Sequence, residues 1–277
     1  MSFQIIGDSC TDLTKEQRAS AEFKLVPLTL EIGEDTFIDD ESFDQALFIK
    51  KMKAYPDAPK SACPAPEAYM NLFDNADDNY VVTLSGRLSG SYNSAEVAKQ
   101  MYLEQEEKNI AIIDSKSASV GQALIATKIK ELADAGLPFS EIEEKANKFR
   151  DEMVTLFVLE DLENLRKNGR LSNMKAMLAN VLNIKPVCAA TEEGEIEQLE
   201  QARGIKKALL KMADLVVQKA VHPEEKILGI SHCNNYERAV FTRDEIMKRV
   251  AFKECVIVDM AGVSTLYAND GGIIVSF

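Results

Sequence analysis

Short apolar runs alternate along this chain with longer segments whose apolar residues lie three or four positions apart. In the first half, the runs at residues 3–6, 80–84 and 109–113 are typical of buried strands, and a segment of helical spacing follows each one. An alternation of strands and helices indicates a mainly parallel sheet covered by helices. We therefore predict a βαβ-like N-terminal α/β domain over residues 1–157.

The second half has a different pattern, which begins with an apolar run at residues 154–159. Two further runs flank the sequence Glu-Glu-Gly-Glu and predict a β-hairpin with Gly194 in its turn. The remaining predicted elements are strands at 227–232, 255–261 and 273–277, helices at 204–221 and 236–250, and a loop over 262–272. This pattern predicts a second α/β domain, residues 158–277, with a mixed or antiparallel sheet and helices. No linker rich in Pro, Gly or Ser separates the halves, so we expect the two domains to be packed tightly together.

Three local patterns give sharper predictions. Residues 25–32 form one apolar stretch that predicts a single strand. Asp12 or Thr14 is placed to cap a short helix. Ser140 followed by Glu143 fits a capping box and predicts that a helix begins at Ser140.

Serine follows each of the three N-terminal strands, as Ser9, Ser85 and Ser115. The carboxyl ends of parallel strands share one edge of a sheet, and open α/β sheets bind ligands at that edge. The turn at residues 85–94 also precedes a predicted helix, whose N-terminus favours a negatively charged group. The sequence therefore predicts an anion site in this turn.

Composition restricts the class of partner. The chain has 277 residues, 46% hydrophobic and 28% charged, which is typical of a soluble globular protein with a sizeable core. Its formal net charge of −13 argues against nucleic acid and against binding to anionic lipid surfaces by charge alone. No apolar run approaches the roughly 18 residues of a membrane span, and no signal peptide is expected. Five widely spaced cysteines favour reduced thiols and a cytoplasmic location.

Serine catalysis and nucleotide binding both lack a matching motif. Ser89 could act as a nucleophile, but its surroundings do not form the Gly-x-Ser-x-Gly elbow, and His232 would have to supply the base from the other domain. Helix capping or contact with an anion explains the same serines. Neither a Gly-x-x-x-x-Gly-Lys-Ser/Thr loop nor a Gly-x-Gly-x-x-Gly motif after the first strand is present.

The charged residues leave further alternatives open. Several aspartates are dispersed without a recognisable metal-ligand spacing, so helix caps and turn residues explain them more simply: Asp8, Asp12, Asp39, Asp40 and Asp114. Arg170 and Arg203 each stand beside a glycine, outside an apolar pattern. They fit surface charge, an intramolecular salt bridge, or contact with an anionic partner.

Six stretches in order resemble the DegV family of bacterial fatty-acid-binding proteins, essentially from end to end. They are residues 7–13 (GDSCTDL), 88–95 (LSGSYNSA), 113–121 (IDSKSASVG), 162–172 (LENLRKNGRLS), 182–187 (LNIKPV) and Arg203. The resemblance implies two α/β domains with one long-chain fatty acid held in a tunnel between them. It also implies that the protein presents the carboxylate to a separate fatty acid kinase for acyl-phosphate formation, with no catalytic residue, metal or cofactor of its own.

The resemblance places individual residues as well. Ser89 and Gly90 would meet the carboxylate, and Ser61 falls where the family commonly has Thr in a Thr-Ser-Gln-Pro-Ser loop, here Ser-Ala-Cys-Pro-Ala. Arg170 and Arg203 match positions associated with the kinase contact. The shape of such a tunnel depends on the packing of residues such as Leu28, Phe157, Leu159, Met174 and Met177, and the sequence does not give the direction of their side chains.

The largest departure from the family lies near the C-terminus. Many members have a histidine followed by Gly-Pro-Gly, and the histidine contributes to carboxylate binding. Here Thr265 stands at that place, so Ser264, Thr265 and Tyr267 are the candidate hydroxyls. The alternative is an enzyme in its own right, either a serine hydrolase or a kinase-like relative of dihydroxyacetone kinase, whose fold the family's resembles.

Overall fold

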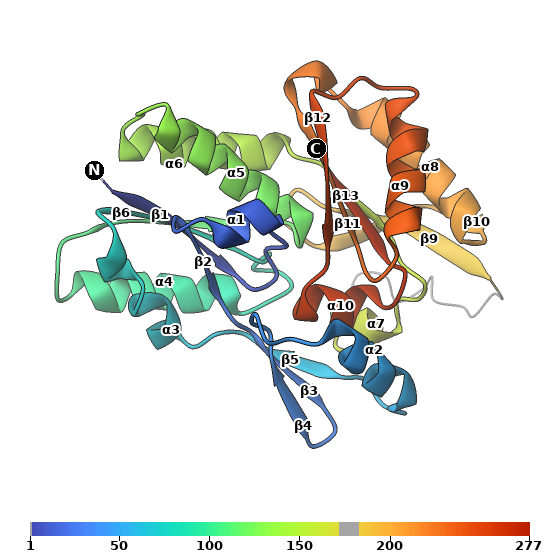
Figure 1. Cartoon of the computed structure of the whole chain (residues 1–277), viewed down its shortest axis with the longest axis horizontal. Helices are drawn as coiled ribbons and strands as arrows, with labels where there is room; N and C mark the ends of the chain where they lie inside the picture. The colour runs from blue at the N-terminus through green and yellow to red at the C-terminus, as the bar shows by residue number, and fades with distance from the viewer. Residues whose placement is uncertain (1, 172–182) are drawn as a thin grey trace.

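The computed structural model describes residues 2–171 and 183–277, and in these residues it contains three β-sheets with helices around them (Figure 1). Two of the sheets form the cores of two α/β halves, as the sequence predicts. The first is wholly parallel and the second is mixed.

The parallel sheet has the strand order β2-β1-β6-β7. Its strands are β1 (Phe3–Asp8), β2 (Phe23–Val26), β6 (Asp78–Thr83) and β7 (Asn109–Asp114). One face is covered by α5 (Val120–Asp134) and α6 (Phe139–Glu152), and the other by α3 (Pro66–Met70) and α4 (Ser91–Leu103) (Figure 1). A short helix, α1 (Lys15–Ala19), and the 3-10 segment Phe73–Asn75 complete this half.

The mixed sheet has the order β10-β9-β8-β13-β11-β12. Its strands are β8 (Thr155–Val158), β9 (Ile184–Ala190), β10 (Ile196–Arg203), β11 (Ile227–His232), β12 (Glu254–Asp259) and β13 (Ile273–Ser276). The helices α8 (Ile205–Lys219) and α9 (Tyr236–Met247) cover one face (Figure 1), and the 3-10 segment Pro223–Glu225 precedes β11. The hairpin of β9 and β10 is confirmed, with Gly194 at φ 84° in its turn.

A small antiparallel sheet, order β4-β3-β5, extends from the first half. It consists of β3 (Thr29–Ile32), β4 (Asp35–Ile38) and β5 (Lys60–Ala62), with α2 (Gln45–Ala54) beside it. The single strand predicted over residues 25–32 is therefore wrong. The chain leaves the parallel sheet after Val26 and enters the small sheet at Thr29, and Pro27 at the break has no N–H to continue a ladder.

Two other local predictions need correction, and one is confirmed. The predicted loop over 262–272 contains a helix, α10 (Gly262–Ala268), which packs against α2 and the short α7 (Glu163–Lys167). Helix α6 begins at Phe139 after Pro138, without a side-chain cap from Ser140. Thr14 does cap α1, in a capping box with Gln17.

The two large sheets are held together by α5, which contacts β1 and β6 of the parallel sheet and β11 and β13 of the mixed sheet. The predicted domain division, between residues 157 and 158, passes through β8. All four residues of β8 pair within the mixed sheet. A division just before β8 keeps each sheet whole. Among the described helices, none combines the length and the apolar character that a bilayer crossing requires.

Candidate functional site

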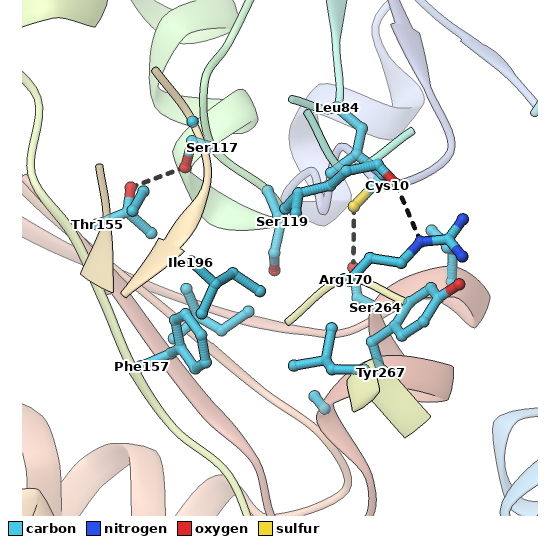
Figure 2. A pocket seen from close by; sticks show the side chains of 18 of the residues that line it. Cys10, Leu84, Ser117, Ser119, Thr155, Phe157, Arg170, Ile196, Ser264 and Tyr267 are labelled. Carbon is cyan, nitrogen blue, oxygen red and sulfur yellow. Dashed lines mark hydrogen bonds between the residues drawn. The ribbon is translucent and has the colours of Figure 1, made fainter. Parts of the chain in front are cut away.

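A cavity lies between the carboxyl edge of the parallel sheet and the inner face of the mixed sheet (Figure 2). It holds about 750 Å³ of space between protein atoms, its open mouth included. Most of its lining is apolar: Cys10, Leu84, Leu88, Ala118, Phe157, Leu159, Leu165, Ala190, Ile196, Val263, Ala268 and Ile274. Such a wall suits a long apolar ligand.

The alternation of side chains along β8 builds one wall of the cavity. Leu156 and Val158 point into the core beneath α8, whereas Phe157 and Leu159 point to the opposite side and line the cavity. Successive side chains of a strand face opposite sides of a sheet, so an uninterrupted apolar run is needed when both faces are covered. The run at residues 154–159, apolar except for Thr155, thus serves the core and the cavity together.

Polar groups gather at the two ends of the cavity. At one end the Ser117 and Thr155 hydroxyls lie 2.7 Å apart, and Thr155 lies 3.0 Å from the Ser276 hydroxyl. At the other end are Arg170 and Tyr267 (Figure 2). The hydroxyls at the first end satisfy one another. The other polar residues of the lining are Lys116, Ser119, Glu195 and Ser264.

Three distant segments meet around Tyr267. Its hydroxyl lies 2.9 Å from Ser61 Oγ on β5. The Arg170 guanidinium lies 5.8 Å from the centre of the Tyr267 ring, and Arg170 Nε donates to the Leu88 carbonyl at 3.1 Å. Ser61, the turn at Leu88 and α10 therefore form one polar rim at this end of the cavity, here called the head-group rim.

The turn after β6 brings Ser89 to this rim. The Leu88 and Ser89 N–H groups both donate to the Ser85 carbonyl, and the Ser91 N–H donates to Ser89 Oγ at 3.2 Å. Helix α4 begins at Ser91, within the turn predicted over residues 85–94. Gly90 must be small here, because a Cβ at this position would lie 2.9 Å from the Cys63 sulfur. The turn is therefore compact, and α4 begins directly after it.

Buried carboxyl groups support the loops around the cavity. Asp8 accepts from the Leu84 N–H at 2.7 Å and from Gln122 Nε2 at 3.0 Å, and burial raises its pKa to about 6. Asp12 accepts from the Ser119 hydroxyl and from the Ala261 N–H at 2.7 Å, and burial raises its pKa to about 7. Asp8 and Asp12 therefore hold turns together, as the sequence predicts for these aspartates. Unlike ordinary turn residues, they are buried.

Asp39 holds the N-terminus of α10. Its carboxylate accepts from the N–H groups of Gly262 and Val263, at 2.6 and 2.8 Å, and burial raises its pKa. In residues 2–171 and 183–277 there is no group of three or more His, Cys, Asp or Glu that could hold a metal ion.

The predicted site residues divide into three groups. Ser264, Tyr267 and Arg170 line the cavity, and Ser61, Ser89 and Gly90 stand at or next to the head-group rim. Thr265 is buried outside the lining, where its hydroxyl lies 3.1 Å from Gln45 Nε2. Arg203 is exposed at the end of β10, away from the lining.

Four further residues line the cavity without having been predicted as ligand contacts, namely Cys10, Ser117, Ser119 and Thr155. The first three lie within the family stretches 7–13 and 113–121, whereas Thr155 lies outside the family stretches. Of the predicted wall residues, Phe157 and Leu159 line the cavity, whereas Leu28 is buried elsewhere. Met174 and Met177 lie outside the described residues, as do Ser172 and Leu182 of the family motifs.

The histidines lie apart from the cavity lining. His232, at the end of β11, has its Nδ1 3.3 Å from Asp259 and accepts from the Asn235 N–H at 3.2 Å. Burial lowers its pKa. His222 is exposed. The hydroxyl nearest to Ser89 Oγ is that of Ser91, 3.0 Å away.

Comparison with known proteins matches the whole chain to one family. The DegV family model matches residues 2–277. A DegV domain-containing protein of Streptococcus gordonii is 36% identical over 280 residues, which cover 100% of this chain and 99% of the relative.

Solved structures agree with this match. A DegV family protein from Ruminococcus gnavus, refined with vaccenic acid, has a TM-score of 0.97 and 46% identity, with 100% of this chain and 99% of that chain covered. The fatty acid kinase (Fak) B3 protein of Streptococcus pneumoniae, loaded with linoleic acid, has a TM-score of 0.92 and 34% identity over 100% and 99% of the two chains. The chain belongs to the DegV family.

Proposed function

We propose that this protein is a cytoplasmic carrier that binds one long-chain fatty acid in the cavity between its two large sheets and presents the carboxylate to a separate fatty acid kinase. The observation that carries the proposal is the cavity itself, whose wall is apolar and whose head-group rim is polar. Two similar proteins, described above, have been crystallised with fatty acids.

The energetics favour a lipid over a small polar ligand. Burial of an acyl chain contributes about 0.8 kcal/mol per methylene, so fourteen methylenes give a gross figure of about 11 kcal/mol. Ordering of the chain and lost translational freedom offset much of this. The tail therefore supplies most of the affinity, and neutral hydroxyls are sufficient to orient the head group.

The head-group rim would bind the carboxylate through Ser61, Ser89 and Tyr267. Among the hydroxyls that could replace the family histidine, Tyr267 is favoured because it lines the cavity and reaches Ser61. Ser264 also lines the cavity, but its nearest polar partner is the Cys10 sulfur at 3.6 Å (Figure 2). Thr265 is directed to Gln45 instead.

Two arginines are proposed to contact the kinase. Arg170 lies at the head-group rim, half-buried, where a partner that reaches the carboxylate would meet it. Arg203 is exposed on the same half of the molecule. The similar protein from Streptococcus pneumoniae carries fatty acid kinase in its name, which supports a partner of this class.

Reconstitution tests the proposal. Delipidated protein, oleic acid, ATP and a bacterial fatty acid kinase are mixed, and acyl phosphate is trapped as the hydroxamate. We expect product only when both proteins are present. Hydroxamate formed without the kinase, or ester hydrolysis by this protein alone, would instead identify an enzyme in its own right.

A further inference from the structure

A second cavity lies at the amino edge of the parallel sheet, where β1 begins (Figure 1). It holds about 1120 Å³ of space between protein atoms, its open mouth included. The cavity between the two large sheets lies at the opposite, carboxyl edge, and among the described residues none lines both. The second cavity, here called the amino-edge hollow, is therefore separate from the proposed fatty-acid site.

Strand register places the polar groups of the amino-edge hollow. Phe3 on β1 pairs with Asp78 on β6, and Asp78 pairs with Asn109 on β7. Side chains at paired positions share one face of a sheet, so these three form a row. Tyr80, two residues after Asp78, lies on the same face. The connection from α5 into α6, residues 136–140, also lines the hollow.

Tyr80 brings a buried hydroxyl without a partner to this hollow. The residue is fully buried and belongs to the lining, and its hydroxyl forms no hydrogen bond with any described residue. Its ring is stacked on that of Phe139, with the ring centres 5.1 Å apart. A buried tyrosine hydroxyl usually has a hydrogen-bond partner, because a polar group removed from water without one costs stability. A ligand in the hollow would supply that partner.

Asp78 gives the hollow a negative charge. It is 8% exposed, and its carboxylate accepts from Asn109 Nδ2 at 2.7 Å. Among the described residues that line the hollow there is no Lys, Arg or His. Burial raises the pKa of the Tyr80 hydroxyl, and the charges of Asp78 and Glu143 raise it further, so both carboxyl groups act on this hydroxyl. The polar part of the hollow is therefore acidic and favours a cation.

Aromatic rings make the rest of the wall suitable for a cation. Phe3, Tyr80 and Phe139 contribute three rings, and the negative face of such a ring attracts an ammonium group. Lys130 already makes this contact from outside the lining, with its Nζ 5.7 Å from the centre of the Phe3 ring. Its charge is used elsewhere, because it forms ion pairs with two acidic side chains outside the hollow, at 2.9 Å each.

We propose that the amino-edge hollow binds a small organic ammonium ion, a primary amine joined to a compact apolar group. The N–H groups of the amine donate to the Asp78 carboxylate and to the Tyr80 oxygen, and the apolar group lies against the aromatic rings. An anionic ligand would be repelled by Asp78, and a neutral ligand would leave that buried charge without a counter-charge. This site does not depend on the proposed fatty-acid site.

Calorimetric titration of phenethylammonium chloride into the purified chain tests the charge requirement. Phenethyl alcohol has the same ring and nearly the same shape but carries no charge, so it is the matched control ligand. A hydrogen bond to a charged group contributes about twice as much as a neutral one, so the alcohol should bind at least about tenfold more weakly. Both titrations are repeated with excess oleic acid, which should leave the affinity for the amine unchanged.

Two variants test the named residues. Asp78→Asn should weaken amine binding at least about tenfold, whereas Asp77→Asn, which removes the same charge from an exposed neighbour, should not change it. Tyr80→Phe removes only the unpaired hydroxyl, so it should weaken amine binding about two- to tenfold. The ligand-free Tyr80→Phe protein should be at least as stable as the wild type in urea unfolding. A purely structural role for Tyr80 would not produce this combination.

Four results would overturn the inference. They are absence of amine binding at millimolar concentrations, equal affinity for the amine and the alcohol, unchanged amine affinity in both Asp78→Asn and Tyr80→Phe, and loss of amine binding when oleic acid is added. The last result would place the amine in the larger cavity. Tyr80→Phe decides the outcome if Asp78→Asn does not fold.

Discussion

The hydroxyls of Ser61 and Tyr267 lie 2.9 Å apart, although 206 positions separate these residues in the sequence. Ser61 is on β5 of the small sheet, and Tyr267 is on α10, which packs against α2. The contact joins the N-terminal and C-terminal halves at one end of a largely apolar cavity. Two hydroxyls from the two halves are thereby placed where a carboxylate would meet them.

Replacement of Tyr267 by Phe should weaken fatty-acid binding but leave the apolar wall of the cavity intact. The ring remains, and one neutral hydrogen bond, worth about 0.5–1.5 kcal/mol, is lost, so Kd should rise by up to about tenfold. Competition with a fluorescent fatty acid measures the change. Tyr236→Phe removes an exposed hydroxyl on α9 and is the matched control. Equal affinity of Tyr267→Phe and wild type would show that the Tyr267 hydroxyl does not bind the carboxylate.

Replacement of Arg170 by Ala should slow turnover by the kinase at least tenfold and leave the bound lipid at one per chain. In the proposed function the tail supplies most of the affinity, whereas the guanidinium lies at the rim where we propose that a kinase reaches the carboxylate. Acyl-phosphate formation and lipid content are measured on the same sample. Arg166→Ala, which removes an exposed arginine paired with Glu163, should change neither. Loss of lipid from Arg170→Ala would make Arg170 a structural or ligand-binding residue.

Ile196 should control the length of the acyl chain that fits. It is buried at the start of β10 and lines the cavity beside Phe157 (Figure 2). Ile196→Phe adds volume in a packed wall, which the protein relieves only at a cost of about 1–3 kcal/mol, so the bound acids should become shorter. Mass spectrometry of the bound acids measures the distribution, and Ile196→Leu is the volume-matched control. An unchanged distribution in Ile196→Phe would mean that the chain does not pass this residue.

Asp12 should make the fold less stable as pH rises. Burial raises its pKa in the folded protein to about 7, above the ordinary value of 3.8. Between these two pH values the folded state therefore holds a proton that the unfolded chain releases. The contribution is fully present below pH 4 and is lost as pH rises through 7. Asp12→Asn should therefore be more stable than the wild type at pH 8, by roughly 1–4 kcal/mol, with a smaller advantage near pH 4.

Urea unfolding at the two pH values checks this sign. Asp40→Asn removes an exposed carboxyl and should not raise the stability at pH 8. A variant Asp12→Asn that is less stable at pH 8 would show that Asp12 is ionised in the folded protein and stabilised by its donors.

Strand and helix patterns in the sequence predicted the parallel sheet, the hairpin around Gly194 and the boundaries of most elements, because local periodicity follows burial. They missed α10, since its small and hydroxylated residues carry little helix propensity. Its N-terminus is instead held by the carboxylate of Asp39, more than two hundred positions earlier. A cap supplied from so far away leaves no local signal.

The same limit applies to the site. Family motifs pointed to Ser89 and Arg170, and the place of the family histidine pointed to Thr265. The sequence could not show which of the three candidate hydroxyls in residues 264–267 faces the cavity. Helical geometry decides this: Ser264 and Tyr267, three positions apart, share one face of α10, whereas Thr265 turns to Gln45. Thr155 and Ser117 reach the cavity only because two sheets meet there.

The presence of a lipid in the purified protein tests the central claim most directly. Freshly purified chain is denatured and extracted, and the extract is analysed by mass spectrometry against a known amount of an isotopically labelled fatty acid. The account predicts about one C14–C18 fatty acid per chain, because the cavity wall is apolar and the tail supplies most of the affinity. A protein without lipid that also fails to bind added fatty acid, and whose serine is labelled by a fluorophosphonate, would contradict it.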